Sequence, residues 1–290
     1  MVCLFILVVM YAIAIVVPLI ADKIGIDPYA LHKDLILNSG GGRPKGDFGG
    51  ITAAHPFGVE WGTGRDILSQ ILFGLRISLV IATSATFLTV LFGTVVGILA
   101  GYSGGLMDSL LGRLMDLILC FPFLLIILAL SGVITQRLTD LGVPEGNASR
   151  VLYLILVLSV FGWPYLARIV RGQVLSLRER EFVEAAVAMG AGKPRILFSE
   201  ILPNLWAPIL VYASLALPSY IGAEAALSFL GVGVLAPDVT FGTMLANSVA
   251  FFERVPTLLF IPGTILVILV VSFNLFGDAV RDALDPKVVR

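Results

Sequence analysis

The sequence predicts an all-α integral membrane protein with six transmembrane helices. Hydrophobic residues make up 58% of the 290 residues and charged residues only 13%, about half the charged share of a soluble domain. The mean hydropathy is +1.00. The apolar residues gather in runs of roughly 20 residues, which is the length that an α-helix needs to cross the hydrocarbon of a bilayer.

The six apolar runs define the expected helices. In chain order they are Val2–Ala21, Ile77–Gly101, Leu114–Ile134, Val151–Ala167, Leu205–Leu230 and Leu258–Phe276. Strands are excluded because the runs are too long and lack the alternation of a membrane barrel. The first run could be a cleaved signal peptide, but it is long for one and no basic residue precedes it. We therefore expect residues 1–21 to form a retained first transmembrane helix.

Positive charge sets the expected orientation of these helices. One face carries ten Lys or Arg residues and the other nine, but six of those nine lie in the long loop after the first run. In the positive-inside rule, long loops count little, so the comparison becomes ten Lys or Arg residues against three. The face with ten residues carries both termini, and we expect it to be cytoplasmic. At the cytoplasmic end of the third run, Asp116 is expected to pair with Arg113.

Residues 22–76 form a long extracytoplasmic loop in this topology. Its first part is rich in turn-forming residues, as in Ser39–Pro44. Between residues 64 and 76, apolar residues recur at helical spacing: Ile67, Leu68, Ile71, Leu72 and Leu75. This spacing predicts an amphipathic helix that lies at the membrane interface and leads into the second span. The alternative is an early start of the second span itself.

Two features inside the runs have more than one interpretation. Gly93, Gly97 and Gly101 are each four residues apart, a spacing that allows close approach of another helix, from this chain or from a partner. Glu224 lies in the outer half of the fifth run. An ionisable residue at that depth either lines a translocation path or pairs with a polar neighbour for packing.

Several function classes are excluded by composition. The net charge is −1, so no nucleic-acid-binding surface is expected. His32 and His55 are the only histidines, which excludes HExxH and most multi-histidine metal sites. Cys3 and Cys120 lie in apolar runs and are expected to pack as small hydrophobic residues. A membrane-embedded enzyme is not expected, because Glu224 stands alone and no run contains a histidine.

Residues 171–204 form a cytoplasmic loop with a distinct pattern. Gly190 suits the position that follows a helix, where glycine adopts positive φ, and Pro194 suits the first turn of a second short helix. One predicted helical face is apolar: Leu175, Phe182, Ala186 and Met189. The pattern predicts a helix–glycine–helix elbow on which the small pair Ala185-Ala186 allows another protein to approach. On composition alone, an ordinary solvated loop is the alternative.

This loop resembles the EAA loop of permease subunits of binding-protein-dependent ABC importers. The residues that match the family pattern are Glu184, Ala185, Ala186, Gly190, Leu202 and Pro203, the last of them thirteen residues after the glycine. The resemblance implies that these residues couple the permease to ATPase subunits and transmit ATPase closure into the helices. Glu200 departs from the pattern, which has an apolar residue there.

Further segments narrow the resemblance to the C-type permease subunit of oligopeptide and dipeptide importers. They are His55–Gly58, Gly64–Ser69, Gly74–Leu79, Leu227–Gly233, Phe241–Leu245 and Asn274–Pro286. Val59-Glu60 replaces the usual Thr-Asp, and Phe241 stands where Trp is usual. The resemblance covers about residues 55–287, and we assign residues 77–287 to a permease core of five transmembrane helices.

The resemblance also implies partners and a location. It predicts a bacterial inner membrane importer with a homologous second permease subunit, two ATPase subunits and an extracytoplasmic substrate-binding protein. This chain has no GxxxxGK[ST] loop, because Pro194 follows Gly192-Lys193. ATP and Mg are therefore expected on the ATPase subunits, with no metal or other cofactor and no catalytic residue in this chain. Oligopeptides or dipeptides are the expected solutes, and nickel or glutathione-like solutes are the alternative.

Overall fold

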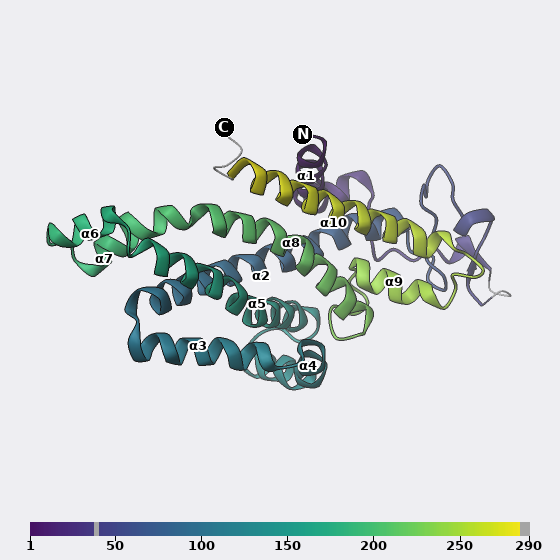
Figure 1. Ribbon diagram of the computed structural model, residues 1–290. Coiled ribbons are helices and arrows are strands. Elements are labelled where there is room, and N and C mark those ends of the chain that lie inside the picture. The colour runs from purple at the N-terminus through teal and green to yellow at the C-terminus, as the bar shows by residue number, and fades with distance from the viewer. Residues whose placement is uncertain (38–40, 285–290) are drawn as a thin grey trace. The chain divides into compact units, whose positions relative to one another are not determined.

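The computed structural model describes residues 1–37 and 41–284 and is mainly helical (Figure 1). The longer helices are α1 Val2–Ile24, α2 Ile67–Ser103, α3 Gly105–Cys120, α4 Phe123–Asp140, α5 Asn147–Leu177, α8 Trp206–Phe229 and α10 Thr257–Leu284. The shorter ones are α6 Glu181–Ala188, α7 Lys193–Arg195, α9 Phe241–Val249, the 3-10 helices η1 Lys33–Leu35, η3 Asp47–Gly49 and η5 Leu202–Leu205, and the π-helix η4 Ile196–Ile201.

A small hairpin interrupts the first loop. Strand β1, Ile36–Leu37, pairs antiparallel with β2, Arg43–Pro44. Some residues that entered the sequence prediction lie outside the described residues: Ser39, Gly40, Asp285, Pro286, Lys287 and Arg290.

The predicted number of membrane-spanning helices is confirmed. Within the described residues, six helical segments are long and apolar enough to cross a bilayer. They are Val2–Ala21, Ile67–Ser103, Phe123–Asp140, Asn147–Leu177, Lys193–Phe229 and Thr257–Leu284. The first of these has the same bounds as the first predicted run, and the others extend beyond the predicted runs or shift along the chain.

The chain divides into two compact units. The first comprises Met1–Thr83, Ser131–Leu154 and Pro218–Leu275. The second comprises Ser84–Leu130, Ile155–Leu217 and Phe276–Arg290. Five of the long helices, α2, α4, α5, α8 and α10, contribute residues to both units. Each unit is described by itself below.

The start of α2 differs from the sequence prediction. The interfacial helix expected over residues 64–76 is not separate, because its turns from Ile67 onward belong to a single helix of 37 residues. Ser69 and Gln70, which suggested a wetted face, are only 5% and 1% exposed. The carboxylate of Asp66 caps the helix and accepts hydrogen bonds from the backbone N–H and the hydroxyl of Ser69, each at 2.7 Å. The polar side chains at the start of α2 are therefore buried inside the first unit and do not face water.

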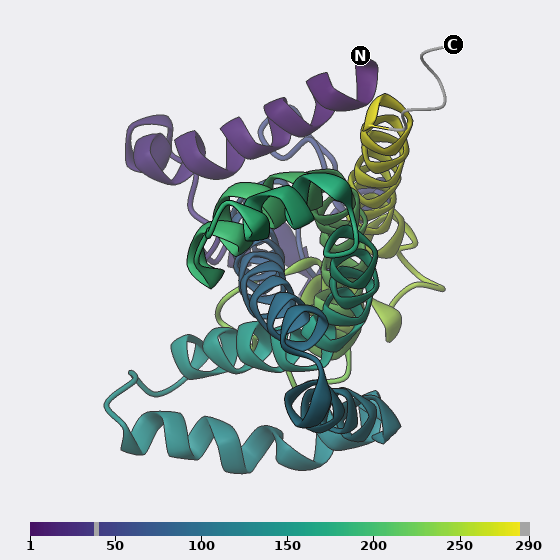
Figure 2. The same cartoon turned by 60° about the vertical axis from the view of Figure 1, so that its left-hand side comes forward.

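The third predicted span, Leu114–Ile134, is wrong in its bounds. A bend at Phe121-Pro122 separates α3 from α4, and both views show it (Figures 1 and 2). Proline has no N–H to donate and disfavours helical geometry in the residue before it. Phe121 accordingly adopts an extended backbone with φ −74° and ψ 135°. Only α4 of this pair is long and apolar enough to count as a span.

The glycines of α2 pack against α5 inside the second unit. A Cβ added to Gly97 would lie 2.7 Å from the carbonyl oxygen of Ala167. On Gly93 and Gly101 it would lie 2.8 Å from a Cβ of α5. These distances are shorter than a van der Waals contact, so the small residues are needed for the approach of the two helices. Of the two interpretations open from the sequence, packing within the chain is the one observed.

Candidate functional site

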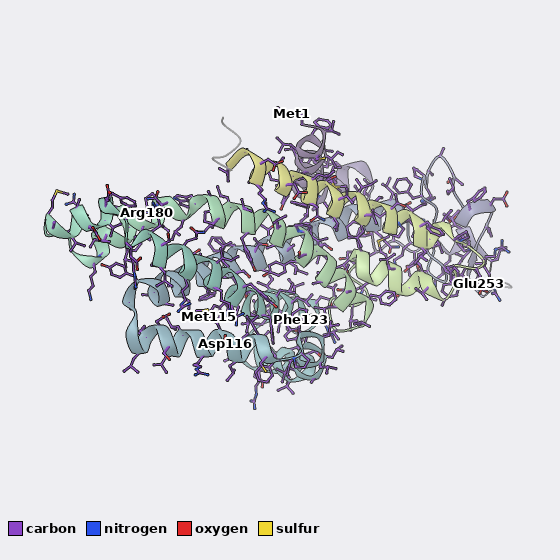
Figure 3. The ribbon with its side chains drawn as sticks, in the orientation of Figure 1. Met1, Met115, Asp116, Phe123, Arg180 and Glu253 are labelled. Carbon is purple, nitrogen blue, oxygen red and sulfur yellow. The ribbon has the colours of Figure 1, made fainter. Side chains whose placement is uncertain are left out.

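The first arm of the elbow is α6, in the second unit. Arg180 precedes it with an extended backbone, φ −87° and ψ 146°, and Figure 3 shows Arg180 at the start of this helix. No side chain caps the amino terminus of α6, but Glu181 and Glu184 lie in its first turn. Carboxylates at this end of a helix offset the partial positive charge of its unpaired N–H groups.

The turn of the elbow is a Schellman motif centred on Gly190. The Ala191 N–H donates to the carbonyl of Ala186 at 3.0 Å, and the Gly190 N–H donates to that of Val187 at 2.9 Å. Gly190 has φ +81°, so the predicted positive φ is confirmed. A Cβ at this position would meet nothing within 4 Å. The need for glycine is therefore conformational and not a matter of space.

The second arm leads into a membrane-spanning helix without an intervening loop. Pro194 lies in the first turn of α7, as predicted. The chain then continues through the π-helix η4 and the 3-10 helix η5 into α8. Leu202 is half-buried and Pro203 is exposed, and both belong to η5. Leu202 and Pro203 thus lie on the helical path from the turn to the fifth span, whereas Glu184, Ala185 and Ala186 lie on α6 before the turn.

The inner face of α6 joins the apolar core of the second unit. Val183 and Ala186 are buried in one cluster with the following residues: Leu166, Val170, Val174, Ile196, Ile201, Leu205 and Ile209. The predicted apolar face is wrong in two places, because Phe182 and Met189 are 40% and 81% exposed. That prediction assumes one continuous helix from Leu175, whereas α5 ends at Leu177 and α6 begins at Glu181 as a separate helix.

The outer face of α6 exposes apolar side chains beside two carboxylates, although it lies outside the candidate spans. We call it the elbow surface, and its exposed residues are Glu181, Phe182, Glu184, Ala185, Val187, Ala188 and Met189. Ala185 is exposed and Ala186 is buried, so the predicted small pair presents only one alanine. Within the described part of the chain, no side chain pairs with the Glu184 carboxylate. Glu181 likewise forms no ion pair among the described residues, so the surface combines two unpaired carboxylates with apolar groups.

Glu224 lies in the first unit and is fully buried. Its carboxylate accepts a hydrogen bond from the hydroxyl of Ser78 at 2.6 Å and another from that of Ser228 at 2.8 Å. Ser228 also accepts a bond from the backbone N–H of Val234 at 3.3 Å. Glu224 thus connects α2, α8 and the segment that follows α8.

Two ion pairs join α3 to α5 in the second unit. Arg168 donates to Asp116 at 2.6 Å, so the predicted partner of Asp116, Arg113, is wrong. Arg171 donates to Asp108 at 2.7 Å through Nη2, and this bond lowers the pKa of Asp108 below its ordinary value. Arg168 and Arg171 are three residues apart, which puts both on one face of α5.

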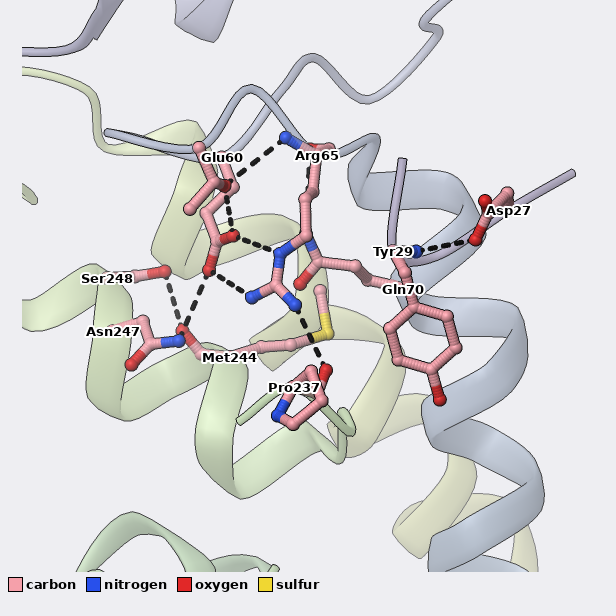
Figure 4. Close-up of polar contacts among 10 residues, drawn as sticks. Asp27, Tyr29, Glu60, Arg65, Gln70, Pro237, Met244, Asn247 and Ser248 are labelled. Atoms are coloured by element: carbon pink, nitrogen blue, oxygen red, sulfur yellow. Dashed lines mark hydrogen bonds and ion pairs between the residues drawn. The ribbon is translucent and has the colours of Figure 1, made fainter. Parts of the chain in front are cut away.

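Sequence reasoning missed a buried ion pair in the first unit (Figure 4). Arg65 donates through Nε to Glu60 at 2.7 Å and through Nη2 at 3.2 Å. Its Nη1 donates to the carbonyl of Pro237 at 3.0 Å, and Asn247 donates to Glu60 at 3.2 Å. We call these four residues the outer clamp. It ties the start of α2 to the segment between α8 and α9. The sequence gives one indication of this ion pair: Glu60 belongs to the Val59-Glu60 pair that departs from the family pattern.

The comparison with protein families decides the identity. Residues 93–290, about two thirds of the chain, match the family described as binding-protein-dependent transport system inner membrane component. The chain belongs to this family. It is a permease subunit of an ATP-driven, binding-protein-dependent importer.

Relatives of known designation agree with this assignment. The dipeptide transport system permease protein DppC of Alkalihalophilus pseudofirmus is 38% identical over 245 residues, covering 84% of this chain and 76% of that protein. The oligopeptide transport system permease protein OppC of Bacillus subtilis is 38% identical over 234 residues, covering 81% and 72%. DppC of Haemophilus influenzae is 34% identical over 276 residues, covering 95% and 86%.

Solved structures share the fold at low sequence identity. A chain of the MetNI methionine ABC transporter, in an inward-facing conformation, gives a TM-score of 0.58 at 19% identity and covers 74% of this chain and 96% of that chain. A chain of an amino acid ABC transporter gives 0.54 at 16% identity, with 74% and 94% covered. The helical architecture of the chain is therefore that of ABC transporter permeases.

Proposed function

We propose that this permease carries oligopeptides or dipeptides and that its elbow surface docks on an ATPase subunit. The observation that supports the docking role is the exposure of Phe182, Val187 and Met189 around the unpaired carboxylate of Glu184, outside the candidate spans. Exposed apolar groups gathered on one surface are typical of protein–protein contacts.

The core of the second unit supports a mechanical role for the same elbow. Val183 and Ala186 share one buried cluster with Ile201 and Leu205, the residues that lead into α8. Close-packed side chains transmit displacement because they cannot be compressed. A push on α6 would therefore move the start of α8 with it as a rigid body. In this proposal, Gly190, Leu202 and Pro203 set the geometry of the elbow, and Glu184 and Ala185 contact the ATPase subunit.

Membership of the family supports a proposal for the complete importer. We place this chain beside a homologous second permease subunit, two ATPase subunits that hold ATP and Mg, and an extracytoplasmic substrate-binding protein, in a bacterial inner membrane. Both termini and the elbow surface lie in the cytoplasm in this proposal. The support for this orientation is the excess of Lys and Arg in the loops of that face.

Cross-linking tests the docking surface. Cys3 and Cys120 are first replaced, and a cysteine is then introduced at Ala185, which is exposed, or at Ala186, which is buried. We expect a short bifunctional reagent to link the Ala185→Cys permease to the ATPase subunit in assembled importer, and to leave the Ala186→Cys control unlinked. Failure of the first variant to link, with the complex intact, would reject the docking role.

The substrate class rests on the designations of the relatives as dipeptide and oligopeptide permeases. We expect proteoliposomes with the complete importer to accumulate a labelled tripeptide when ATP is enclosed, and unlabelled dipeptides and tripeptides to compete. Accumulation of a nickel chelate or of glutathione, without competition by peptides, would support the alternative solutes.

For Glu224 we propose a packing role. The support is its complete burial and the two serine hydroxyls that donate to its carboxylate. A lining role in the translocation path is the alternative, and the two variants described in the Discussion separate them.

A further inference from the structure

The first unit contains a cavity of about 430 Å³ beside the outer clamp. Its lining includes the polar residues Arg65, Gln70, Asp238 and Asn247 and the apolar residues Phe229 and Leu235. Ligand sites in proteins commonly have volumes of about 300–1,000 Å³ and combine an apolar lining with a few placed polar groups. The cavity meets both criteria, and the function described above does not use it.

The charge of Asp238 is oriented but not neutralised. The hydroxyl of Tyr29 donates to Oδ1 at 2.6 Å, and the amide of Asn147 donates to Oδ2 at 3.0 Å. Both donors are neutral, so they hold the carboxylate in place without cancelling its charge. Burial and the neighbouring Asp238 raise the pKa of Tyr29 to about 12, which keeps its hydroxyl protonated as a donor.

The cationic side chain in the cavity lining, Arg65, is already engaged. Two nitrogens of Arg65 donate hydrogen bonds to Glu60, and the third donates to the carbonyl of Pro237. Arg150 donates to the carbonyl of Gly233 at 3.3 Å. Among the described residues, no Lys, Arg or His forms an ion pair with Asp238. The cavity therefore presents a carboxylate that lacks a cationic partner.

We propose that this cavity binds the ammonium group of an amine-bearing solute at Asp238. It would take the amino terminus of a short peptide, and this inference rests on the proposed peptide specificity. A carboxylate that is partly removed from water attracts an ammonium ion more strongly than one in bulk solvent, and the hydrogen bond between them is charge-assisted. Phe229 and Leu235 offer apolar surface to the first side chain.

Other ligands fit this cavity less well. An anion would need a cation without a paired carboxylate, and the guanidinium of Arg65 is already paired with Glu60. A resident metal ion would need several ligands, and the described part of the chain contains no group of three His, Cys, Asp or Glu residues that could hold one. A single carboxylate fixed by two neutral donors matches one ammonium group.

Direct binding tests the inference. The assembled importer without its binding protein, in lipid nanodiscs, is equilibrated with radiolabelled tri-alanine or with N-acetyl-tri-alanine. We expect acetylation to weaken binding about tenfold, because it removes the ammonium charge. Asp238→Asn should weaken the binding of tri-alanine by a similar factor and leave the acetylated peptide unchanged. The matched control is Asp27→Asn, which removes an exposed carboxylate of the same loop as Tyr29.

The inference would be overturned by the absence of saturable tri-alanine binding, by equal binding of both peptides to the parent, by an unchanged affinity of Asp238→Asn for tri-alanine, or by equal weakening of both peptides by Asp238→Asn. The last would show that the substitution acts on structure alone. Failure of the proposed function is separate, since it appears as absence of ATP-dependent peptide uptake by the complete importer. If the importer takes up peptides but Asp238→Asn does not weaken the binding of tri-alanine, the proposed function stands and the proposed subsite is rejected.

Discussion

Gly190 controls the elbow through a single backbone angle. Its φ of +81° suits glycine, and a left-handed conformation costs other residues roughly 1–2 kcal/mol. Gly190→Ala should therefore loosen the turn and reduce uptake, and Gly190→Arg should abolish it by adding bulk beside the elbow surface. Initial rates of ATP-driven uptake measure both. Gly172→Ala is the control, since that glycine lies in α5 without positive φ and with open space around its Cβ position. Normal uptake by both Gly190 variants would contradict the importance of the turn.

Glu184 is one of the two carboxylates of the elbow surface, and it is the one in the motif that resembles the EAA loop. Glu184→Lys reverses a charge that no residue of the described chain neutralises, so we expect the chain to insert normally but to lose the ATPase subunit. Copurification of the ATPase subunit with tagged permease measures this loss. The control is Glu179→Lys, the same reversal at an exposed position that precedes α6. If both variants retained the ATPase equally, Glu184 would have no part in docking.

The buried carboxylate of Glu224 allows two substitutions with different outcomes. Glu224→Gln keeps one oxygen acceptor and places an amide NH2 where the second oxygen was, and the serine hydroxyl there can accept from it, so a packing role predicts a small effect on assembly and transport. Glu224→Leu leaves those two buried hydroxyls without their acceptor, at a cost of about 1–3 kcal/mol, and should lower the yield of folded protein. A path-lining role predicts something else: Glu224→Gln would change the uptake of cationic peptides relative to neutral ones. Uptake ratios and the monodisperse yield after purification separate the two.

At the scale of the element, periodic apolar runs were sufficient to predict the helices but not their ends. The pattern around Ile67 predicts a water-facing side because Ser69 and Gln70 are polar, yet both are buried in the first unit. The polarity of a residue does not reveal whether a buried partner will satisfy it. Pro122, in contrast, was visible in the sequence and marks the bend between α3 and α4, and a proline rule applied there would have divided the third run.

The packing of α2 on α5 gives a prediction for two matched glycines. Gly97→Ala would place a Cβ 2.7 Å from a backbone oxygen of α5, so the helices must separate and the apparent melting temperature should fall. Gly112→Ala in α3 has nothing within 4 Å, and the better helix propensity of alanine should leave stability unchanged or raise it by up to ~1 kcal/mol. Thermal unfolding of the purified permease in one detergent compares them. A fall for both variants, or for neither, would contradict the close contact.

At the scale of the whole molecule, orientation in the membrane has a direct test. With Cys3 and Cys120 replaced, a single cysteine is placed at Gly41 in the first loop or at Lys193 in the elbow, and both positions are exposed. We expect a membrane-impermeant maleimide to label the cysteine at Gly41 in intact cells and the one at Lys193 only in inverted vesicles. Labelling of both positions from the same side would contradict the proposed topology.

Long-range partners are what the sequence could not predict. Arg65 and Pro237 are 172 positions apart, and Ser78 and Glu224 are 146 apart. A periodic pattern identifies a helix from neighbouring residues, but it contains no information about which distant residue meets it. The elbow was predictable because Gly190 and Pro194 act within a few residues of themselves. The outer clamp and the cavity beside it are formed by the first loop together with the segment before α9, and these two parts of the chain are distant in the sequence.

The length of α2 has a consequence for how the protein responds to its lipid environment. A helix of 37 residues is about 55 Å long, whereas the hydrocarbon of a bilayer is about 30 Å thick. Its first turns, with buried Ser69 and Gln70, are surrounded by protein and do not depend on contact with acyl chains. A thicker bilayer can therefore cover more turns of the same helix without stranding an apolar end in water. Hydrophobic mismatch, which tilts or distorts shorter helices, should cost this helix little across membranes of different thickness.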